Sequence, residues 1–397
     1  MDRPTFIACL TPPGKAALAS IGLTGPLAWS LLQPLFQPAG KAHPGPGQPQ
    51  RFWFGQVKDG SMSDQVVITI DGPVDAPRVE LTCHGSPVIV RWLIQRLLQG
   101  NQVQELTWKQ WLRLHAEHRL AGEVDVALAD APTQPMGSLL LIQGQLWQAA
   151  LERWSHQIQT HPVSVAEELQ AILEQQQWGL HILAPWRVVV AGAVNAGKSS
   201  LVNALLGYER SIASPWEGTT RDLVTGRTIV QGWPVELIDT AGLRSQVQHE
   251  VEAAGIALTE HALTQADAVL WLIDAAQPPW LEPPVLHGNC PLLVLLNKID
   301  LLGDCATLPM LYQPHPRRAV SVASMQGLEG LLETLLAPLL PSQEATRQAL
   351  APFTARLQLG VRTVLQLLSE GKPKEAFRTI RSWLEPLPWH QATSVDG

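Results

Sequence analysis

The chain has 397 residues, a length that suits two or three domains rather than one. Apolar residues make up 46% and charged residues 16%, which excludes an intrinsically disordered chain and indicates a folded protein. The net charge of −7 argues against a surface that grips nucleic acid over its whole area.

Targeting signals and cysteine chemistry are not evident in the sequence. The start, MDRPTFIACLTPPG, lacks the pattern of a signal peptide, and no apolar run reaches the roughly 18 residues of a membrane span. We therefore expect a cytoplasmic protein that does not contact a membrane. The cysteines are scattered without metal-type pairing, so we expect them to be small buried residues in a reducing compartment.

The first part of the chain, residues 1–115, is predicted to be a mixed α/β domain. Four short β-rich runs, TFIACLTPP, RFWFGQV, DQVVITID and RVELTCHG, are separated by Gly, Pro and Asp. The run SPVIVRWLIQRLLQG that follows them has apolar residues at helical spacing.

Helical periodicity then continues over residues 116–185 and returns over residues 341–397. Between them, residues 186–340 alternate strands such as WRVVVAG, AVLWLID and PLLVLLNK with helices such as KSSLVNALLG and GLEGLLETLL. This alternation predicts a parallel sheet with helices on both faces. We expect a nucleotide-binding domain inserted between two helical segments that form one bundle.

The stretch VVVAGAVNAGKSSLVNALLG contains a phosphate-binding loop of the form G-x-x-x-x-G-K-[ST]. The loop lies between a strand and a helix, so its backbone N–H groups and the helix N-terminus can hold a β-phosphate. Lys198 is expected to reach the β- and γ-phosphates, and the Ser199 hydroxyl to bind Mg²⁺. The nucleotide-binding residues predicted here are Gly192, Asn195, Ala196, Gly197, Lys198, Ser199 and Ser200.

A second motif, VELIDTAG, ends in Asp239, Thr240, Ala241 and Gly242 after a strand. The carboxylate can hold the Mg²⁺ shell, and the glycine N–H can sense a γ-phosphate. In the preceding segment SPWEGTTRD, Thr220 is expected to bind Mg²⁺ and to sense the γ-phosphate as part of an ordering switch.

A third motif, PLLVLLNKID, places Asn297, Lys298 and Asp300 at the end of another strand. A carboxylate at Asp300 can accept hydrogen bonds from guanine N1–H and N2–H₂, a donor pair that adenine lacks. The sequence therefore predicts a site for GTP and GDP. Residues expected to contact the base after the last strand are Ser321, Val322 and Ala323, for which an ordinary strand end is the alternative interpretation.

The residue after Gly242 is Leu243, whose side chain cannot orient an attacking water molecule as a glutamine does in small signalling GTPases. Asn195 offers a substitute, because its carbonyl oxygen could hold a monovalent cation that bridges the phosphates. The alternative is a turn residue that tolerates unusual backbone angles.

Several of these segments together resemble the MnmE (TrmE) family of tRNA modification GTPases. The similar segments are TPPGKAALASIGLTG, VELTCHGSPVIV, NAGKSSLVNALLG, EGTTRD and DTAGLR…EVEAAGI. Their order also matches the family, with an N-terminal α/β domain of the folate-binding type, a helical domain and an inserted G domain.

The resemblance implies a K⁺-stimulated GTPase that forms a homodimer through its N-terminal domains. Asn195 falls on the family's K⁺ ligand, and the residues of the K⁺-enclosing loop are Ser214, Thr219 and the backbone of Trp216. Glu252 falls on the glutamate that assists the attack of water, with a solvated helical charge as the alternative.

The resemblance also implies a flavin-dependent partner, MnmG, and modification of the wobble uridine of certain tRNAs with a one-carbon unit from a 5-formyltetrahydrofolate-like cofactor. Glu80 and Arg119 fall on family folate contacts, but Gly22 stands where the family has an arginine. Tight folate binding is therefore not expected. The chain ends QATSVDG, without the Cys-Ile-Gly-Lys motif that the family needs for modification, so we expect a divergent member.

Two other functions stay open at this point. One is a regulatory GTPase that keeps dimer switching but has lost folate and tRNA chemistry. The other is a ribosome-assembly GTPase of the Era or Der kind, which shares the asparagine in the phosphate loop. That second function predicts a basic RNA-binding domain after the G domain, and the tail has only a weak excess of basic residues.

Overall fold

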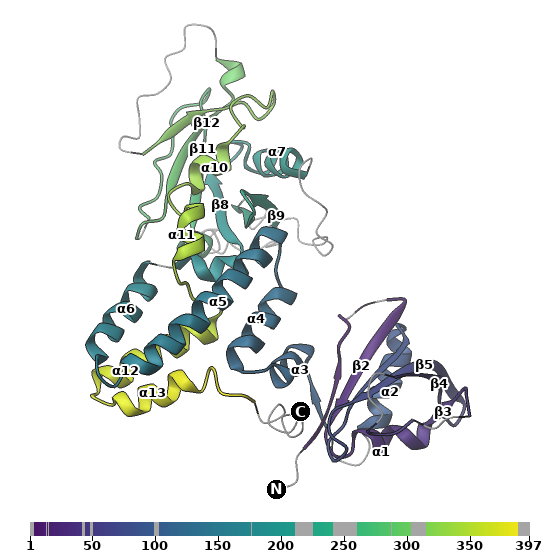
Figure 1. Ribbon diagram of the computed structural model, residues 1–397. Coiled ribbons are helices and arrows are strands. Elements are labelled where there is room, and N and C mark those ends of the chain that lie inside the picture. The colour runs from purple at the N-terminus through teal and green to yellow at the C-terminus, as the bar shows by residue number, and fades with distance from the viewer. Residues whose placement is uncertain are drawn as a thin grey trace. The chain divides into compact units, whose positions relative to one another are not determined.

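The computed structural model describes residues 4–12, 14, 16–41, 44–47, 51–98, 103–175, 177–210, 225–240, 260–286, 288–302 and 315–387 (Figure 1). The chain divides into two compact units, Met1–Val126 with Arg378–Gly397 and Ala127–Phe377. No helix in these described ranges is both long and apolar enough to cross a membrane. The division into three domains with the boundaries given above stays a prediction.

The first unit is built on a seven-stranded sheet in the order β3-β4-β5-β6-β2-β1-β7. Its neighbouring strands are antiparallel, except that β1 and β7 run in parallel. The strands are β1 (Thr5–Cys9), β2 (Leu18–Thr24), β3 (Phe36–Pro38), β4 (Phe52–Asp59), β5 (Met62–Asp71), β6 (Arg78–His84) and β7 (Val103–Leu106). The helices are α1 (Ala28–Leu32), η1 (Gln33–Leu35), α2 (Pro87–Leu97) and α3 (Trp108–His115).

Helices α1 and α2 cover one face of this sheet, and the apolar side chains between them form its core. Side chains along β5 alternate between the two faces of the sheet. Val66, Ile68 and Ile70 are buried on the face that α1 and α2 cover, while the residues between them are more accessible. The four β-rich runs of the sequence become β1, β4, β5 and β6, and the apolar helical run becomes α2. The predicted N-terminal α/β fold is confirmed.

The second unit contains a helical region whose two parts come from opposite sides of the nucleotide-binding segment. On α5, the Gln143 side chain donates to the Ala349 carbonyl oxygen at 2.9 Å and accepts from the Ala351 N–H at 2.9 Å. The Trp147 indole donates to the Ala351 carbonyl oxygen at 2.8 Å. The helices of this region are α5 (Gln134–Gln157), α6 (Pro162–Gln175), η2 (Gln177–Ile182), α11 (Gln343–Gln348) and α12 (Ala355–Ser369), and the division between the two units falls within α4 (Arg119–Ala129) and α13 (Pro373–Arg381). Because buried hydrogen bonds join the two parts, they are held as one helical region.

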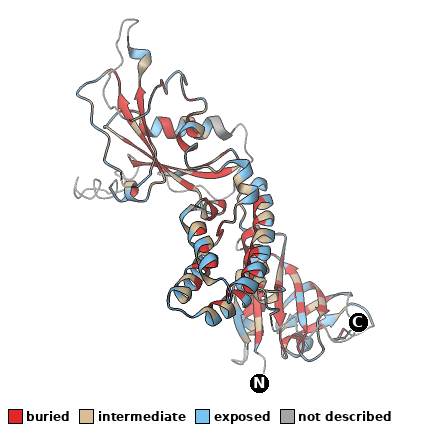
Figure 2. Ribbon diagram, turned by 60° about the vertical axis from the view of Figure 1, so that its left-hand side comes forward, coloured by how far each residue is buried: buried red, intermediate tan, exposed pale blue. Residues whose placement is uncertain are grey.

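The nucleotide-binding segment forms a six-stranded sheet in the order β13-β12-β11-β8-β10-β9. Neighbours are parallel, as predicted, except that the edge strand β9 runs antiparallel to β10, which the alternation of elements did not predict. Every residue of β12 is buried, as expected for a strand covered on both faces (Figure 2). The elements are β8 (Trp186–Gly192), α7 (Lys198–Arg210), β9 (Thr225–Val230), β10 (Trp233–Asp239), β11 (Ala268–Asp274), β12 (Leu292–Asn297), η3 (Ile299–Leu301), β13 (Arg317–Ala319) and α10 (Leu331–Leu336).

An aromatic cluster joins this sheet to the helical region of the same unit. The Trp178 and Trp233 rings meet edge to face with centroids 6.0 Å apart, and His181 stacks on Trp186 with centroids 3.5 Å apart. The Thr133 hydroxyl, which caps α5, donates to the Gly232 carbonyl oxygen at 2.8 Å. These three tryptophans therefore serve packing between the sheet and the helical region.

The buried imidazole of His181 should make this unit less stable in mild acid. Burial lowers the pKa of His181 below its ordinary value of 6.5, although nearby Asp267 acts in the opposite direction. As the pH falls below about 6.5, His181 binds a proton in the unfolded chain but not in the folded protein, so the free energy of unfolding decreases. We expect His181→Phe, which keeps a ring on Trp186, to gain stability relative to the wild type as the pH is lowered. Thermal unfolding from pH 7.5 to 5.5 measures this, and parallel curves for the two proteins would contradict it.

The described cysteines behave as core or half-buried residues. Burial, with a smaller contribution from Asp64, raises the pKa of the Cys83 thiol to about 12, so this thiol stays neutral and unreactive. The half-buried thiols of Cys9 and Cys290 donate to the carbonyl oxygens of Thr11 and Ala266. Cys305 lies outside the described residues.

Candidate functional site

The predicted phosphate loop connects β8 to α7, and its glycines stand where a side chain would not fit. A Cβ on Gly192 would lie 2.0 Å from the Leu272 carbonyl oxygen, and one on Gly197 would lie 2.7 Å from the Asn297 amide nitrogen. Both glycines have positive φ, 141° and 98°, which other residues rarely adopt. Glycine at these two positions therefore lets the loop pack closely against Leu272 and Asn297.

Lys198 opens α7 and is almost fully buried, as expected for the lysine of a phosphate loop. Its ammonium donates to the carbonyl oxygens of Ala193 at 2.7 Å and Gly192 at 3.2 Å, so it lies within the loop. The next two residues, Ser199 and Ser200, are exposed at the N-terminus of the helix. A phosphate here would meet backbone N–H groups, the positive end of the helix dipole and a lysine.

Asp239 ends β10, which runs parallel to β8 with Asp239 opposite Val190, and Thr240 follows the strand. Both side chains are buried, and the Thr240 hydroxyl donates to the Val190 carbonyl oxygen at 3.0 Å. The carboxylate therefore stands beside the strand that leads into the phosphate loop, where it suits the shell of a Mg²⁺ ion bound to phosphate oxygens.

Asn297 joins the phosphate loop to the segment expected to contact the base. Its side-chain amide donates to the Ala196 carbonyl oxygen at 2.8 Å, and its carbonyl oxygen accepts from the Val322 N–H at 3.1 Å. The residue is only 2% exposed, so these bonds are shielded from water. Ser321, next to Val322, is fully buried, while Ala323 is exposed. The structure thus brings three predicted motifs together at one edge of the sheet.

Beyond Asn297 the chain turns sharply, because Lys298 adopts a left-handed backbone with φ 65°. This turn leads into η3, where Asp300 is exposed. Lys298 forms an ion pair with Asp274 at the end of β11, with 2.6 Å between Nζ and Oδ2. Asp274 was not among the predicted residues. One signal in the sequence could have found it, since AVLWLID ends in an aspartate at the same sheet edge as VELID.

Other predicted site residues lie outside the described residues, so their roles stay predictions. They are Ser214, Trp216, Thr219, Thr220, Ala241, Gly242 and Glu252.

The residues predicted for folate lie in the first unit. An aromatic ring lies over Gly22, the position at which the family has an arginine. The Thr107 hydroxyl accepts from the Gln110 N–H, which fixes the start of α3. One turn on, the buried Trp111 ring covers Gly22, where a Cβ would lie 2.5 Å from the ring atom Cζ2. No arginine fits at position 22, so these residues do not fit a folate anchored there.

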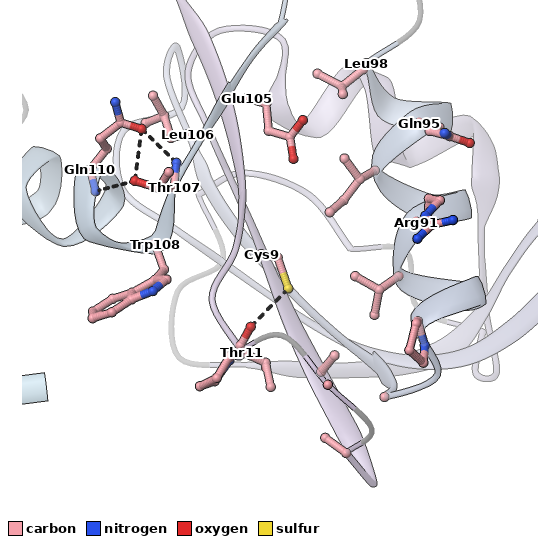
Figure 3. Close-up of a pocket in the computed structure, with 18 residues that line it drawn as sticks. Cys9, Thr11, Arg91, Gln95, Leu98, Glu105, Leu106, Thr107, Trp108 and Gln110 are labelled. Carbon is pink, nitrogen blue, oxygen red and sulfur yellow. Dashed lines mark hydrogen bonds between the residues drawn. The ribbon is translucent and has the colours of Figure 1, made fainter. Parts of the chain in front are cut away.

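Glu80 is exposed on β6 and pairs with Gly22 in the sheet register, on the face opposite α2. Arg119 begins α4 and donates to the Ser382 hydroxyl at 3.4 Å. A cavity of about 770 Å³ in the same unit lies between α2 and the β1–β7 edge, with Arg91, Cys9 and Glu105 in its wall (Figure 3). Neither Glu80 nor Arg119 lines this cavity.

Gly22→Arg should destabilise the first unit by roughly 1–3 kcal/mol, because the new side chain must displace the buried Trp111 ring. Gly40→Arg is the matched control, since no atom lies within 4 Å of a Cβ at that position. Urea unfolding of both variants measures the difference. Equal stability of the two would show that Trp111 does not fill the space over Gly22.

Comparisons with known proteins agree with this geometry. Residues 187–298 match the family model of the 50S ribosome-binding GTPases, and residues 5–110 match that of the GTP-binding protein TrmE N-terminus. The tRNA modification GTPase MnmE of Chloroflexus aurantiacus is 30% identical over 380 residues, covering 85% of this chain and 82% of the relative. The proteins of the same name from Thermotoga maritima and Sodalis glossinidius are 28% and 29% identical, over 75% and 77% of this chain and 73% and 75% of the relatives.

Proposed function

Because the chain belongs to the MnmE family of tRNA modification GTPases, we propose that it hydrolyses GTP in the presence of Mg²⁺ and K⁺ and acts in the cytoplasm in wobble-uridine modification. The observation that carries the proposal is Asn297, which joins the phosphate loop to the segment proposed to contact the base through two hydrogen bonds. A site built in this way holds the phosphates and the guanine of one nucleotide in a fixed relation.

Lys198 and Asp239 support the metal-dependent part of the proposal. The lysine would stabilise charge on the β- and γ-phosphates, and the Ser199 hydroxyl and the Asp239 carboxylate would hold Mg²⁺ directly or through water. Thr220 would complete the Mg²⁺ site when GTP is bound, and Glu252 would assist the attacking water.

The K⁺ part of the proposal is supported by Asn195, whose side chain is exposed and whose φ of 60° is unusual for a residue other than glycine. A cation held by its carbonyl oxygen would offset developing charge on the phosphates, as an arginine finger does. Ser214, Thr219 and the backbone of Trp216 would supply the other ligands, and closure of two G domains on each other would shield the ion.

Hydrolysis of GTP should be at least about tenfold faster in KCl than in NaCl at equal ionic strength, because a K⁺ ion held at Asn195 would offset the charge that develops on the phosphates. Asn195→Ala should remove the difference while leaving GDP affinity close to that of the wild type. Steady-state phosphate release measures both. Equal rates in the two salts for the wild-type protein would remove the cation role from Asn195.

A homodimer formed through the first unit is supported by its exposed sheet face, on the side away from α2. Phe52 and Phe54 on β4 are 79% and 54% exposed there, and Leu18 on β2 lies on the same face. Exposed apolar side chains of this kind support an interaction surface. An MnmG-like flavoprotein is the proposed partner in modification, and tRNA would bind mainly through that partner. Folate is not part of the proposal.

Complementation tests the biological role most directly. In cells that lack the family enzyme, expression of this chain should restore modified wobble uridine, measured by mass spectrometry of digested tRNA, and expression of Lys198→Ala should not. Absence of modification with an intact GTPase would favour the regulatory alternative.

The match to 50S ribosome-binding GTPases covers only residues 187–298, whereas the relatives named for tRNA modification match most of the chain.

A further inference from the structure

Asp274 lies at the end of β11, and both of its carboxylate oxygens accept hydrogen bonds. The residue is 7% exposed and pairs in register with Asn297 of β12. Its Oδ2 accepts from Lys298 Nζ at 2.6 Å, and its Oδ1 accepts from the Ala276 N–H at 3.0 Å. Its backbone carbonyl oxygen accepts from the Trp280 indole at 2.9 Å. The carboxylate is therefore held at both of its oxygens, and the backbone of Asp274 is held by Trp280.

Lys298 is the residue that this carboxylate restrains. Its backbone lies in the left-handed region, so the side chain leaves the strand in a direction that an ordinary strand residue does not take. A free lysine side chain populates many rotamers, and holding it in one conformation costs entropy. The pair with Asp274 selects one conformation before any ligand arrives, and a nearly buried partner carboxylate is screened little by water.

The position of Lys298 gives this restraint a consequence for binding. Asn297 on one side is bonded to the phosphate loop, and Asp300 lies two residues further along on the other side. Lys298 therefore lies along the chain between the residue that contacts the phosphate loop and the carboxylate expected to read guanine.

We propose that Asp274 is a positioning residue for the guanine site, which holds the Lys298 stem in place as a surface for the base. The proposal rests on the proposed function, because it requires a guanine nucleotide in this site. Asp274 does not touch the nucleotide. It acts through Lys298 and pre-organises the site, so its loss increases the rate at which the nucleotide leaves.

The test is a double-mutant cycle on the release of fluorescent GDP from the full chain. Asp274→Asn keeps the shape and the acceptor for Ala276 but removes the charge, and Lys298→Met keeps the stem but removes the ammonium. Each variant should release GDP about tenfold faster than the wild type. The double variant should release it no faster than either single variant, because the effect passes through one pair.

Asp267→Asn is the matched control, since this carboxylate lies before the opposite end of β11 and accepts from the Arg187 N–H at 2.7 Å. It should release GDP at the wild-type rate. Additive effects of the two single variants would show that Asp274 acts by stabilising the strand, which overturns the inference. If Asp274→Asn does not fold, wild-type release from Lys298→Met overturns it equally. Failure of the wild-type protein to bind GDP would instead refute the proposed function itself.

Discussion

Replacing Asp300 with asparagine should weaken the binding of GDP and GTP by a factor on the order of 10² to 10³, because two charge-assisted hydrogen bonds to the guanine N–H groups are lost. Asp300 lies on η3, just beyond the left-handed turn at Lys298. Calorimetric titration of GDP into the wild type and the variant measures the effect. Unchanged affinity with unchanged preference for guanine over adenine would remove the base-reading role from Asp300.

Two comparisons make this result specific to base recognition. Xanthosine diphosphate carries a carbonyl group where guanine has its 2-amino group, and an asparagine amide can donate to that carbonyl. Asp300→Asn should therefore bind xanthosine diphosphate better than the wild type does. Glu282→Gln, which neutralises another exposed carboxylate in the second unit, should bind GDP as the wild type does.

Lys198→Ala should slow GTP hydrolysis by about 10²- to 10³-fold, because the variant loses the one described cation that lies within the phosphate loop. The affinity for GTP should fall more than the affinity for GDP, since Lys198 would contact the γ-phosphate as well as the β-phosphate. Single-turnover phosphate release at saturating GTP separates the rate from the affinity.

Arg227→Ala serves as the control for loss of positive charge, because this residue lies on the edge strand β9 and its Nε lies 3.2 Å from the Glu236 carboxylate. It should hydrolyse GTP at the wild-type rate. Hydrolysis by Lys198→Ala at the wild-type rate would mean that the phosphates are held elsewhere.

Local patterns in the sequence were sufficient to predict the phosphate loop and much of the sheet around it. The apolar run of β8, the glycines of the loop and the start of α7 at Lys198 follow one another directly, so no long-range information is needed. The same holds for β12, whose six consecutive apolar or amide residues end in the predicted Asn297. The sequence predicted that Asn297 lies at a strand end, but it did not predict the hydrogen bond from Asn297 to the Ala196 carbonyl oxygen.

Contacts between distant segments account for what the sequence did not predict. Trp111 covers Gly22 because the capping box at Thr107 sets the direction of α3, and the distance of 89 positions between them leaves no local pattern. The pair of Asp274 and Lys298 depends on the register of β11 against β12. A shift of that register by one residue would turn Asp274 to the other face of the sheet. Register of this kind depends on the packing of whole strands.

Calorimetric titration of the purified wild-type chain with GDP, GTP and ATP in Mg²⁺ and K⁺ buffer tests the central claim most directly. The arrangement of Lys198, Asn297 and Asp300 predicts one site per chain that releases heat with both guanine nucleotides and shows no binding of ATP at the same concentrations. Absence of heat with both GDP and GTP, or equal binding of ATP, would contradict the account.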